Sequence, residues 1–255
     1  MERLVPIRRE NAQILILVKA YPRPSVTYGE TDCVAGLYEG REWVRLYPVL
    51  FRGLPVHQQF SKWQWITCTL TKSRRDSRTE SWEPDHDGLT VGSTISSQGH
   101  GWSSRLRYLS NIPNDTIEGL QEDPRRSLGW VHPHEVRRFF YRSDTSQWPS
   151  HLQLQQLSFL GTPNEPIEKI PYTFYADFTC SEPCRGHRLS IVDWEIYSLY
   201  RNTRDPEKVI QKLNTLHQSC ALSFFVGTSL RHHARRVYMI IGLFYPPKIV
   251  PQVFL

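Results

Sequence analysis

The sequence predicts an α+β protein, with a small antiparallel β-barrel in the N-terminal half and a smaller mixed α/β C-terminal half. Three observations predict this class. Short runs rich in β-branched and aromatic residues fill the first seventy positions, helix signals begin only near residue 113, and strand-like and helix-like runs alternate beyond residue 171. The length of 255 residues fits one large domain or two small ones.

Four short strands are expected in the N-terminal half, because each run is rich in the residues that favour pleated structure. They cover residues 14–18, 31–38, 43–47 and 63–70. Pro22 and Pro24 interrupt the chain after the first run, Glu39-Gly40 forms a turn, and Pro48 ends the third run. Such short connections favour an antiparallel barrel over a parallel sheet, whose crossovers need helices.

The middle of the chain is expected to leave the barrel. Residues 72–101 are polar and rich in Ser, Asp and Gly, which predicts a long loop. Helix signals follow in residues 113–142, where Asn114 or Asp115 caps a first short helix and Pro133 begins a second. Residues 143–171 are rich in Gln, Ser and Pro, which indicates a domain boundary.

Strand-like and helix-like runs alternate in the last part of the chain. Strands are expected at 172–178, 221–227 and 237–244, and helices at 192–200 and 205–218. Asp205 is a favourable N-cap and Pro206 suits the first helical position. We therefore expect a barrel domain at 1–110, a helical linking segment at 111–165 and a mixed α/β domain at 166–255.

The charge balance favours an anionic partner. Lys and Arg number 31 against 25 for Asp and Glu, and arginine outnumbers lysine, which suits bidentate recognition of phosphate. The apolar runs 14–18 and 237–245 are too short for a signal-peptide core or a membrane helix. Five cysteines, an odd number, fit reduced thiols better than a disulfide scaffold. We expect a cytoplasmic protein that does not span a membrane.

A candidate metal-binding turn contains Cys180, Cys184 and His187. Thiolate and imidazole are ligands that Zn²⁺ prefers, and the intervening Pro183 and Gly186 let the backbone turn tightly enough to bring them together. The sequence therefore predicts structural zinc, and the alternative is two free thiols and a surface histidine. Three ligands are one short of the usual four, and the candidates for the fourth are Cys220, His217, His232 and His233.

Asp193 and Glu195 form a second candidate site at an expected helix start. Such a pair can hold Mg²⁺ or act as acid and base in a metal-dependent nuclease, with His187 as a further group. The alternative is that acidic residues in a first helical turn satisfy free amides and complement the helix dipole. The nearest lysine along the sequence, Lys208, belongs to another helix, so the sequence favours the structural role.

Cations and aromatic residues are interleaved in the barrel half. Because bases stack on exposed rings and phosphates pair with cations, this pattern is typical of proteins that bind single-stranded nucleic acid. A second basic stretch at 231–236 is either a phosphate-contacting loop or a solvated turn. Strand alternation leaves only part of the set free to bind. We expect binding by Arg45, Arg52, Arg74, Arg75, Arg78, Trp82, Arg105, Arg235 and Arg236.

Three segments in the first part of the chain resemble the opening of prokaryotic "dual OB-containing" domain proteins. They are Cys33-Val34-Ala35-Gly36, Trp43-Val44-Arg45-Leu46-Tyr47-Pro48 and Asp76-Ser77-Arg78-Thr79-Glu80-Ser81. The resemblance ends near residue 85, and Leu46-Tyr47 stands where that family has a polar residue after the arginine. It implies an OB-like barrel in a nucleic-acid-associated module of bacterial genome defence or mobile elements, without an assigned reaction.

Three functions remain open on the sequence. The favoured one is a nucleic-acid-binding accessory or adaptor protein that grips single-stranded DNA or RNA through the barrel and uses zinc as scaffold. The first alternative is a metal-dependent nuclease or nucleic-acid-modifying hydrolase that uses Asp193 and Glu195. The second is a protein–protein interaction subunit of a larger defence complex. The enzyme gains if both carboxylates enter one open pocket, and it loses if their oxygens cap a helix.

Overall fold

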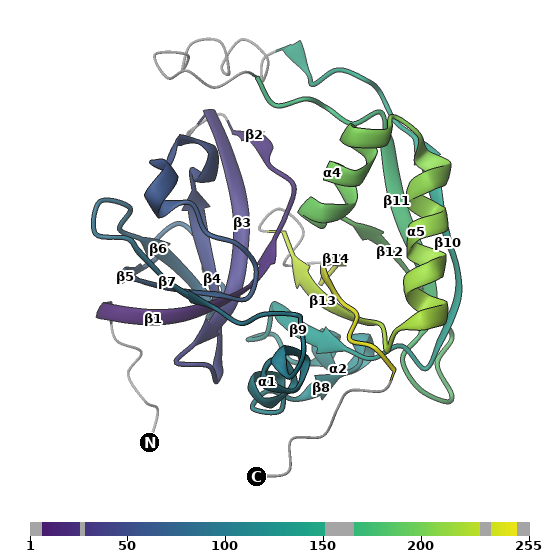
Figure 1. Cartoon of the computed structure of the whole chain (residues 1–255), viewed down its shortest axis with the longest axis horizontal. Coiled ribbons are helices and arrows are strands. Elements are labelled where there is room, and N and C mark those ends of the chain that lie inside the picture. The colour runs from purple at the N-terminus through teal and green to yellow at the C-terminus, as the bar shows by residue number, and fades with distance from the viewer. Residues whose placement is uncertain (1–6, 26–28, 151–165, 230–235, 249–255) are drawn as a thin grey trace.

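The computed structural model describes residues 7–25, 29–150, 166–229 and 236–248, and joins an N-terminal barrel to a second sheet with helices (Figure 1). The α+β class predicted from the sequence is confirmed. The first half contains β1 (Arg8–Lys19), β2 (Arg23–Ser25), β3 (Gly29–Tyr38), β4 (Glu42–Val49), β5 (Gln64–Lys72), β6 (Ser81–Pro84), β7 (Thr90–Thr94) and the 3₁₀ turns η1 (Phe51–Gly53) and η2 (Val56–Gln58). Further along the chain follow α1 (Gly101–Leu109), β8 (Asn114–Asp115), α2 (Ile117–Glu122), β9 (Leu128–Val131), β10 (Glu135–Ser143), β11 (Tyr172–Thr179), β12 (His187–Ile191), α4 (Trp194–Thr203), α5 (Pro206–Ser219), β13 (Ser223–Thr228) and β14 (Tyr238–Phe244).

Five strands of the first sheet close into a barrel. Their order is β1-β3-β4-β6-β5, and β5 pairs back with β1 to complete the ring. The pairing of β4 with β6 is parallel and the other four pairings of the ring are antiparallel. This is the strand arrangement of an OB-like barrel. Gly36 is needed on β3, because a Cβ there would lie 2.2 Å from the Leu15 carbonyl oxygen of β1.

Strand β1 is buried on both faces, which explains why its sequence is a continuous apolar run. Ile14 and Ile16 point into the barrel core. Leu15 and Leu17 point the other way and pack in a cluster that includes Phe225 of β13. Successive side chains of a strand alternate between faces, so both sets can be apolar only where both faces are covered. The barrel and the second sheet therefore share a core along β1.

The second sheet has the order β10-β11-β12-β14-β13-β9-β8. Helices α4 and α5 pack on one of its faces, where they meet inward-pointing residues such as Phe174 and Phe178 of β11 (Figure 1). Asp193 and Asp205 cap these helices, since each accepts a hydrogen bond from the amide two residues further along, at 2.7 Å and 2.9 Å. The helices lie where the sequence predicts them.

Two segments differ from the expectation. Residues 113–142, expected to be helical, hold only the short α2 and contribute β8, β9 and β10 to the second sheet. Val136, Phe139 and Phe140 have helical spacing, but Phe139 is buried while Phe140 lies on the opposite face, as a strand requires. Residues 72–101, expected to be a loop, contain β6 and β7. No helix in the described part of the chain is long and apolar enough to cross a bilayer.

Candidate nucleic-acid interface and metal cluster

Two arginines that were expected to bind nucleic acid are buried between the barrel and the second sheet. Arg45 has no exposed surface and donates to the Ser127 hydroxyl at 2.7 Å and to the carbonyls of Ser127 and Thr228 at 3.0 Å and 3.4 Å. Its burial lowers its pKa. Arg78 is 4% exposed and donates to the same Thr228 carbonyl. The expectation that Arg45 and Arg78 contact phosphate is therefore wrong, because both side chains point into the protein.

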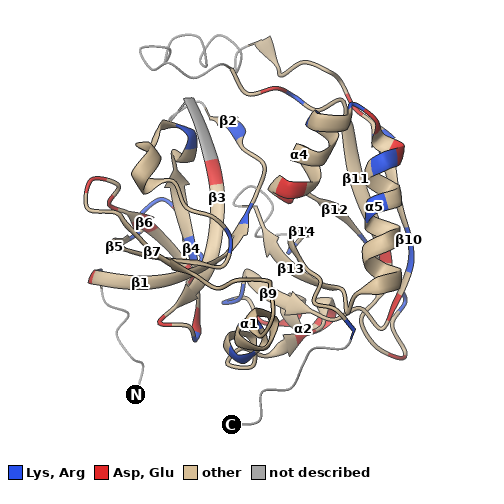
Figure 2. Cartoon of the chain, viewed as in Figure 1, with Lys and Arg blue, Asp and Glu red and all other residues tan. Residues whose placement is uncertain are grey.

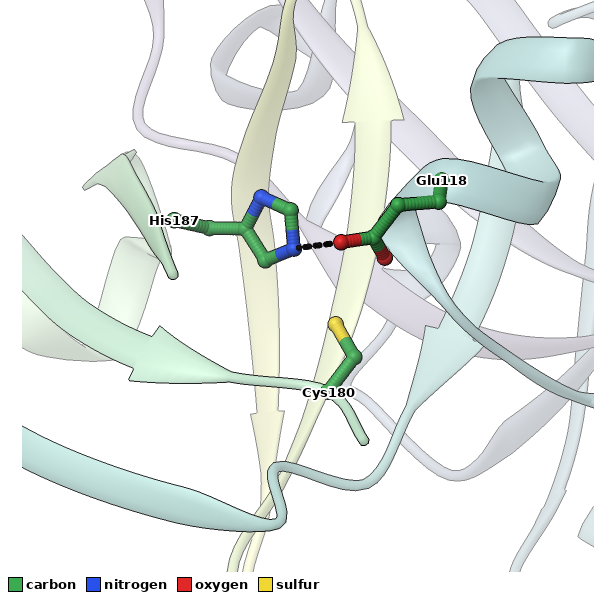
Figure 3. Close-up of side chains that lie close together, drawn as sticks. All are labelled: Glu118, Cys180 and His187. Atoms are coloured by element: carbon green, nitrogen blue, oxygen red, sulfur yellow. Dashed lines mark ion pairs between the residues drawn. The ribbon is translucent and has the colours of Figure 1, made fainter. Parts of the chain in front are cut away.

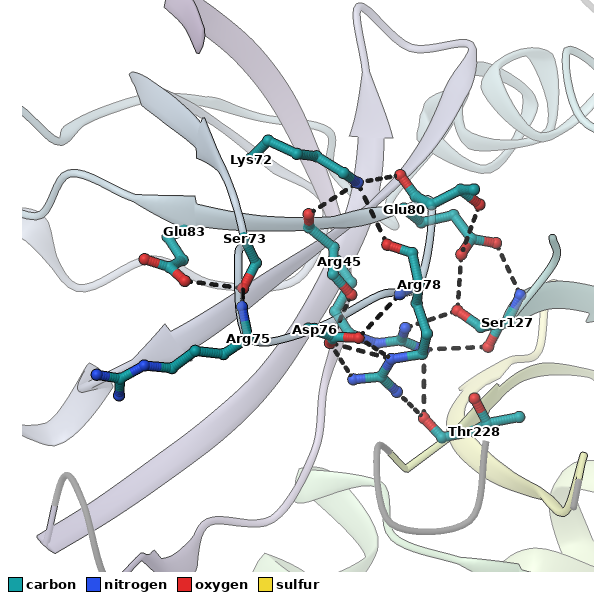
Figure 4. Close-up of polar contacts among 12 residues, drawn as sticks. Arg45, Lys72, Ser73, Arg75, Asp76, Arg78, Glu80, Glu83, Ser127 and Thr228 are labelled. Atoms are coloured by element: carbon teal, nitrogen blue, oxygen red, sulfur yellow. Dashed lines mark hydrogen bonds and ion pairs between the residues drawn. The ribbon is translucent and has the colours of Figure 1, made fainter. Parts of the chain in front are cut away.

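The loop that follows β5 is held in place by Asp76 (Figure 4). Asp76 accepts from Arg78 Nε at 2.8 Å and from the Ser81 hydroxyl at 2.7 Å. Burial alone would raise the pKa of Asp76, but these hydrogen bonds and the charge of Arg78 lower it to about 2. Glu80, at the end of the loop, accepts from the amide and hydroxyl of Ser127 at 2.8 Å and 2.7 Å. The loop is thus anchored to the second half of the chain.

The other expected barrel residues divide into buried and exposed groups. Trp82 is 1% exposed and belongs to the barrel core, so it has no ring face for a base. Arg105 is half-buried between two tryptophan rings, 4.9 Å and 5.0 Å from their centroids, and donates to a backbone carbonyl. Arg52 is also half-buried, whereas Arg74 and Arg75 are exposed. The expectation for Trp82 is wrong, and only Arg74 and Arg75 lie on the open surface.

The second basic stretch is described only in part. Arg236 is half-buried and its guanidinium donates to the backbone carbonyl of Gln121. Its side chain therefore contacts the last turn of α2. Arg235 lies outside the described residues.

A basic and aromatic surface that the sequence analysis missed lies on the second sheet, on the side opposite to the buried residues of β10 and β11. We call it the β10–β12 face, and it consists of Arg138, Phe140, Arg142, Tyr175, Asp177 and Arg188. Cross-strand register places these residues in rows across the three strands. Figure 2 shows basic positions along β10. Alternation of Arg138-Phe139-Phe140-Tyr141-Arg142 would have revealed the surface had the segment been taken as a strand.

The centre of this face is an aromatic stack. The rings of Phe140 and Tyr175 are 5.2 Å apart with an interplanar angle of 13°. The guanidiniums of Arg138 and Arg188 lie 4.8 Å and 5.2 Å from the Phe140 centroid, and that of Arg142 lies 5.6 Å from the Tyr175 centroid. Both rings are half-buried, so each keeps part of its surface in solvent. The arrangement combines π surface with cations.

One carboxylate organises two of the three arginines. Asp177 accepts from Arg138 Nε at 2.8 Å and from Arg188 Nε at 2.8 Å. The hydrogen bonds from Arg188 and then Arg138 lower the pKa of Asp177 to about 2. The side chains of Arg138 and Arg188 remain 59% and 47% exposed. Since the β10–β12 face contains three arginines and one carboxylate, it carries a net positive charge.

The candidate metal-binding turn lies beside a residue that the sequence did not indicate. His187 Nε2 lies 2.9 Å from Glu118 Oε1 of α2 (Figure 3). It also lies 3.2 Å from the Cys184 sulfur. The donor atoms of Glu118, Cys180 and His187 all lie within 4.8 Å of one another. Burial raises the pKa of the Cys180 thiol to about 12. No sequence signal pointed to Glu118, because it lies far from the turn along the chain.

The earlier candidates for a fourth ligand are elsewhere. His217 is on α5, where its ring lies 6.4 Å from that of Phe139. Cys220 follows the same helix and lies near the hydroxyl of Ser219, at 3.6 Å. Neither belongs to the group of donor atoms around His187. His232 and His233 lie outside the described residues.

Asp193 and Glu195 meet a lysine from the barrel half. Asp193 is fully buried, and its Oδ2 accepts from Lys62 Nζ at 2.6 Å and from the Leu243 amide at 3.1 Å, while Oδ1 caps α4. Lys62 also pairs with Glu195 at 3.1 Å. Burial opposes the charge on Lys62, but the two carboxylates raise its pKa. The expectation that no lysine lies nearby is wrong, since Lys62 comes from the other half of the chain.

The two carboxylates do not share an open pocket. Glu195 is half-exposed and lines a cavity of about 220 Å³ with Lys62, Arg105 and Tyr245. Asp193 is not among the residues of that cavity, and its oxygens are used by the helix cap, the lysine and a strand amide. Under the criterion set out from the sequence, this geometry favours a structural role for Asp193.

Comparison with known proteins identifies two regions in the chain. Residues 113–255 match the family described as Domain of unknown function (DUF8757), and residues 10–111 match the one described as Domain of unknown function (DUF8758). No curated protein matches the chain. Among solved structures, the chain is similar to one described as "Crystal structure of p204 HINb domain", with 8% identity, 95% of this chain and 100% of that chain covered, and a TM-score of 0.35.

Proposed function

We propose that this chain, which belongs to the family described as Domain of unknown function (DUF8757), binds single-stranded nucleic acid through the β10–β12 face. The observation that carries the proposal is the parallel stack of Phe140 and Tyr175 on a sheet surface, surrounded by three arginines. Bases stack on aromatic rings whatever their sequence, and cations beside the rings pair with the phosphates. A sheet that presents aromatics in this way is a common platform for RNA and single-stranded DNA.

The three arginines differ in whether they pair with a carboxylate. Arg138 and Arg188 share Asp177, so their side chains are positioned by it while remaining about half exposed. Among the described residues, Arg142 makes no hydrogen bond to a carboxylate. Its guanidinium lies beside the rings of Phe140 and Tyr175. Arginine presents a planar fork that suits phosphate. We therefore assign the strongest phosphate contact to Arg142.

The barrel contributes a smaller surface to the proposal. Arg74 and Arg75 are exposed in the loop between β5 and β6, which is one of the loops through which OB-like barrels contact oligonucleotides. Arg45 and Arg78, which flank this region, fasten it to the second sheet instead. A role as an accessory or adaptor protein in genome defence rests only on the dual OB-containing resemblance and stays a prediction.

The test is fluorescence anisotropy with labelled single-stranded DNA, duplex DNA and single-stranded RNA of the same sequence, over a series of salt concentrations. The slope of log affinity against log salt should become shallower by about 0.7 in Arg142→Ala, because one phosphate contact to a single strand is lost. Phe140→Ala should weaken binding by about 1 to 3 kcal/mol and leave the slope unchanged. Circular dichroism and thermal unfolding check that both variants fold.

The matched control is Lys212→Ala, which removes the same charge from an exposed position on α5. It should change neither affinity nor slope beyond error. The proposal is overturned if Lys212→Ala and Arg142→Ala behave alike, since binding would then follow net charge alone. Absence of salt-dependent binding to all three oligonucleotides at low ionic strength also overturns it and favours a protein partner.

A further inference from the structure

We propose that Glu118, Cys180, Cys184 and His187 bind one zinc ion that holds α2 against the turn between β11 and β12. The proposal is independent of nucleic-acid binding, because it rests on different residues. Two thiolates, one imidazole and one carboxylate are donors that Zn²⁺ binds, and four protein ligands make a closed, structural site. The sequence supplies three of them in one turn, and the fold supplies the fourth from a separate helix.

The separations of the donor atoms suit a tetrahedral ion. Zinc bonds of about 2.0 to 2.3 Å at tetrahedral angles place ligand atoms about 3.3 to 3.8 Å apart. His187 Nε2 lies 2.9 Å from the Glu118 carboxylate and 3.2 Å from the Cys184 sulfur. The donors of Glu118, Cys180 and His187 span at most 4.8 Å. The first two separations are shorter than a tetrahedral edge and 4.8 Å is longer, so the side chains have to adjust when the ion binds. The Cys184 sulfur, which contacts His187, has to move closer to the other donor atoms.

Backbone amides support the two sulfurs. The Gly186 amide donates to the Cys184 sulfur at 3.3 Å, and the Ile117 amide approaches the Cys180 sulfur at 3.5 Å. Such outer hydrogen bonds orient thiolate ligands and stabilise their charge. Gly186 has a φ of +98°, which lets the chain turn back between Cys184 and His187. The turn therefore brings the Cys184 sulfur to within 3.2 Å of His187 Nε2.

A cation lies next to the site. With two thiolates and one carboxylate around Zn²⁺, the site would carry one net negative charge. An ideal Cβ on Gly186 would lie 2.7 Å from a guanidinium nitrogen of Arg137, so this arginine is packed against the turn. Its positive charge partly offsets the charge of the ligand set. Arg137 also pairs with Glu135 at 3.5 Å, so it is only partly available to the site.

The consequence for the fold is a cross-link between distant parts of the chain. Glu118 belongs to α2, near the β8–β9 edge of the second sheet, whereas Cys180 and Cys184 lie between β11 and β12 and His187 is the first residue of β12. Bound zinc would link these two regions. Because the unfolded chain has no such site, the free energy of zinc binding would add to the stability of the folded chain. Removing the ion should therefore lower the melting temperature of the whole chain.

The experiment measures metal content and coordination in the full chain purified without chelator. Elemental analysis should find about one zinc per chain. Titration of the metal-free protein with Co²⁺ should give the thiolate-to-cobalt absorption of a tetrahedral site. Both signals should be lost in Cys184→Ser and in His187→Ala, whereas Glu118→Gln should weaken Co²⁺ binding by about tenfold or more while keeping the thiolate band.

Cys220→Ser is the matched control, because it removes a half-buried thiol that lies outside the cluster. It should keep full metal content and the cobalt spectrum. The proposal is overturned if wild-type protein carries no zinc and gives no cobalt band, or if Cys220→Ser loses metal as Cys184→Ser does. A mass that shows a Cys180–Cys184 disulfide in protein purified without oxidant also overturns it. The cobalt titration of the wild type decides the matter even if a variant fails to fold.

Discussion

Neutralising Asp76 should destabilise the chain more than any loop substitution nearby. Asp76 is 2% exposed and accepts four hydrogen bonds from the Arg78 side chain and amide, and one from Ser81. Arg78 in turn donates to the carbonyl of Thr228 in the second sheet. Asp76→Asn keeps the size of the side chain but removes its charge. It would leave Arg78 buried beside Arg45, without its counter-ion.

The size of the effect follows from the pKa. The pKa of Asp76 falls from 3.8 to about 2, and about 1.4 kcal/mol corresponds to each pKa unit, so the ionised carboxylate contributes about 2 kcal/mol at neutral pH. The variant also leaves the buried guanidinium of Arg78 without a counter-ion, and breaking a buried ion pair typically costs about 3 to 5 kcal/mol. We expect Asp76→Asn to lower the free energy of unfolding by about 3 kcal/mol at pH 7.

The pH dependence has a definite sign. Because the pKa of Asp76 is lower in the folded chain than in the unfolded one, its contribution is complete above about pH 4 and is lost as the pH falls towards 2. The difference in stability between wild type and Asp76→Asn should therefore be constant from about pH 7 to 5 and shrink below about 4. Urea unfolding followed by tryptophan fluorescence measures both quantities.

Asp87→Asn is the control, since Asp87 is exposed in the loop between β6 and β7. It should change the free energy of unfolding by less than about 0.5 kcal/mol. The reasoning is refuted if Asp76→Asn costs no more than Asp87→Asn at pH 7. It is equally refuted if the cost of Asp76→Asn is the same at pH 3 as at pH 7.

Two further predictions concern the cluster of Lys62, Asp193 and Glu195. Lys62→Met should lower the free energy of unfolding by about 3 kcal/mol, because the fully buried Asp193 loses its cation. The control, Lys208→Met on the exposed face of α5, should have little effect. Equal urea midpoints for the two variants would contradict this prediction. The double variant Asp193→Ala, Glu195→Ala should abolish no nuclease activity, because the Asp193 oxygens already bind a helix amide, a strand amide and Lys62. If the wild type cleaves an oligonucleotide with Mg²⁺ and the double variant does not, the structural role assigned to Asp193 is wrong.

Local signals in the sequence located most of the secondary structure. The β-branched runs gave β1, β3, β4 and β5, and the Asp205-Pro206 pair marked the start of α5. These succeed because capping and strand propensity depend on neighbours along the chain. The prediction of a helix over residues 135–143 was wrong because the outcome there depends on contacts with a distant strand. Their apolar spacing fits a helix as well as a strand, and pairing with β11 decides between the two.

The candidate sites depended on contacts that the sequence does not contain. Arg45 and Arg78 have the composition of a phosphate-binding surface, but the second half of the chain covers them. Zinc at Cys180, Cys184 and His187 stays a prediction, and Glu118, which the sequence did not indicate, lies beside Cys180 and His187 through the packing of α2. A basic residue in a sequence gives its charge and not the side of the protein it faces.

The same packing shows why the two matched regions depend on each other. Leu15 and Leu17 of the barrel share a cluster with Phe225 and Phe244 of the second sheet, and all four are essentially buried. A fragment that ended near residue 111 would expose this apolar face of β1 and leave Arg45 without its hydrogen-bond acceptors. Fully burying one such apolar side chain contributes about 1.5 to 3 kcal/mol, which is large against the 5 to 15 kcal/mol that stabilises a typical protein. The barrel therefore owes part of its stability to the sheet that carries the β10–β12 face, and the arginines between them hold the two parts in register.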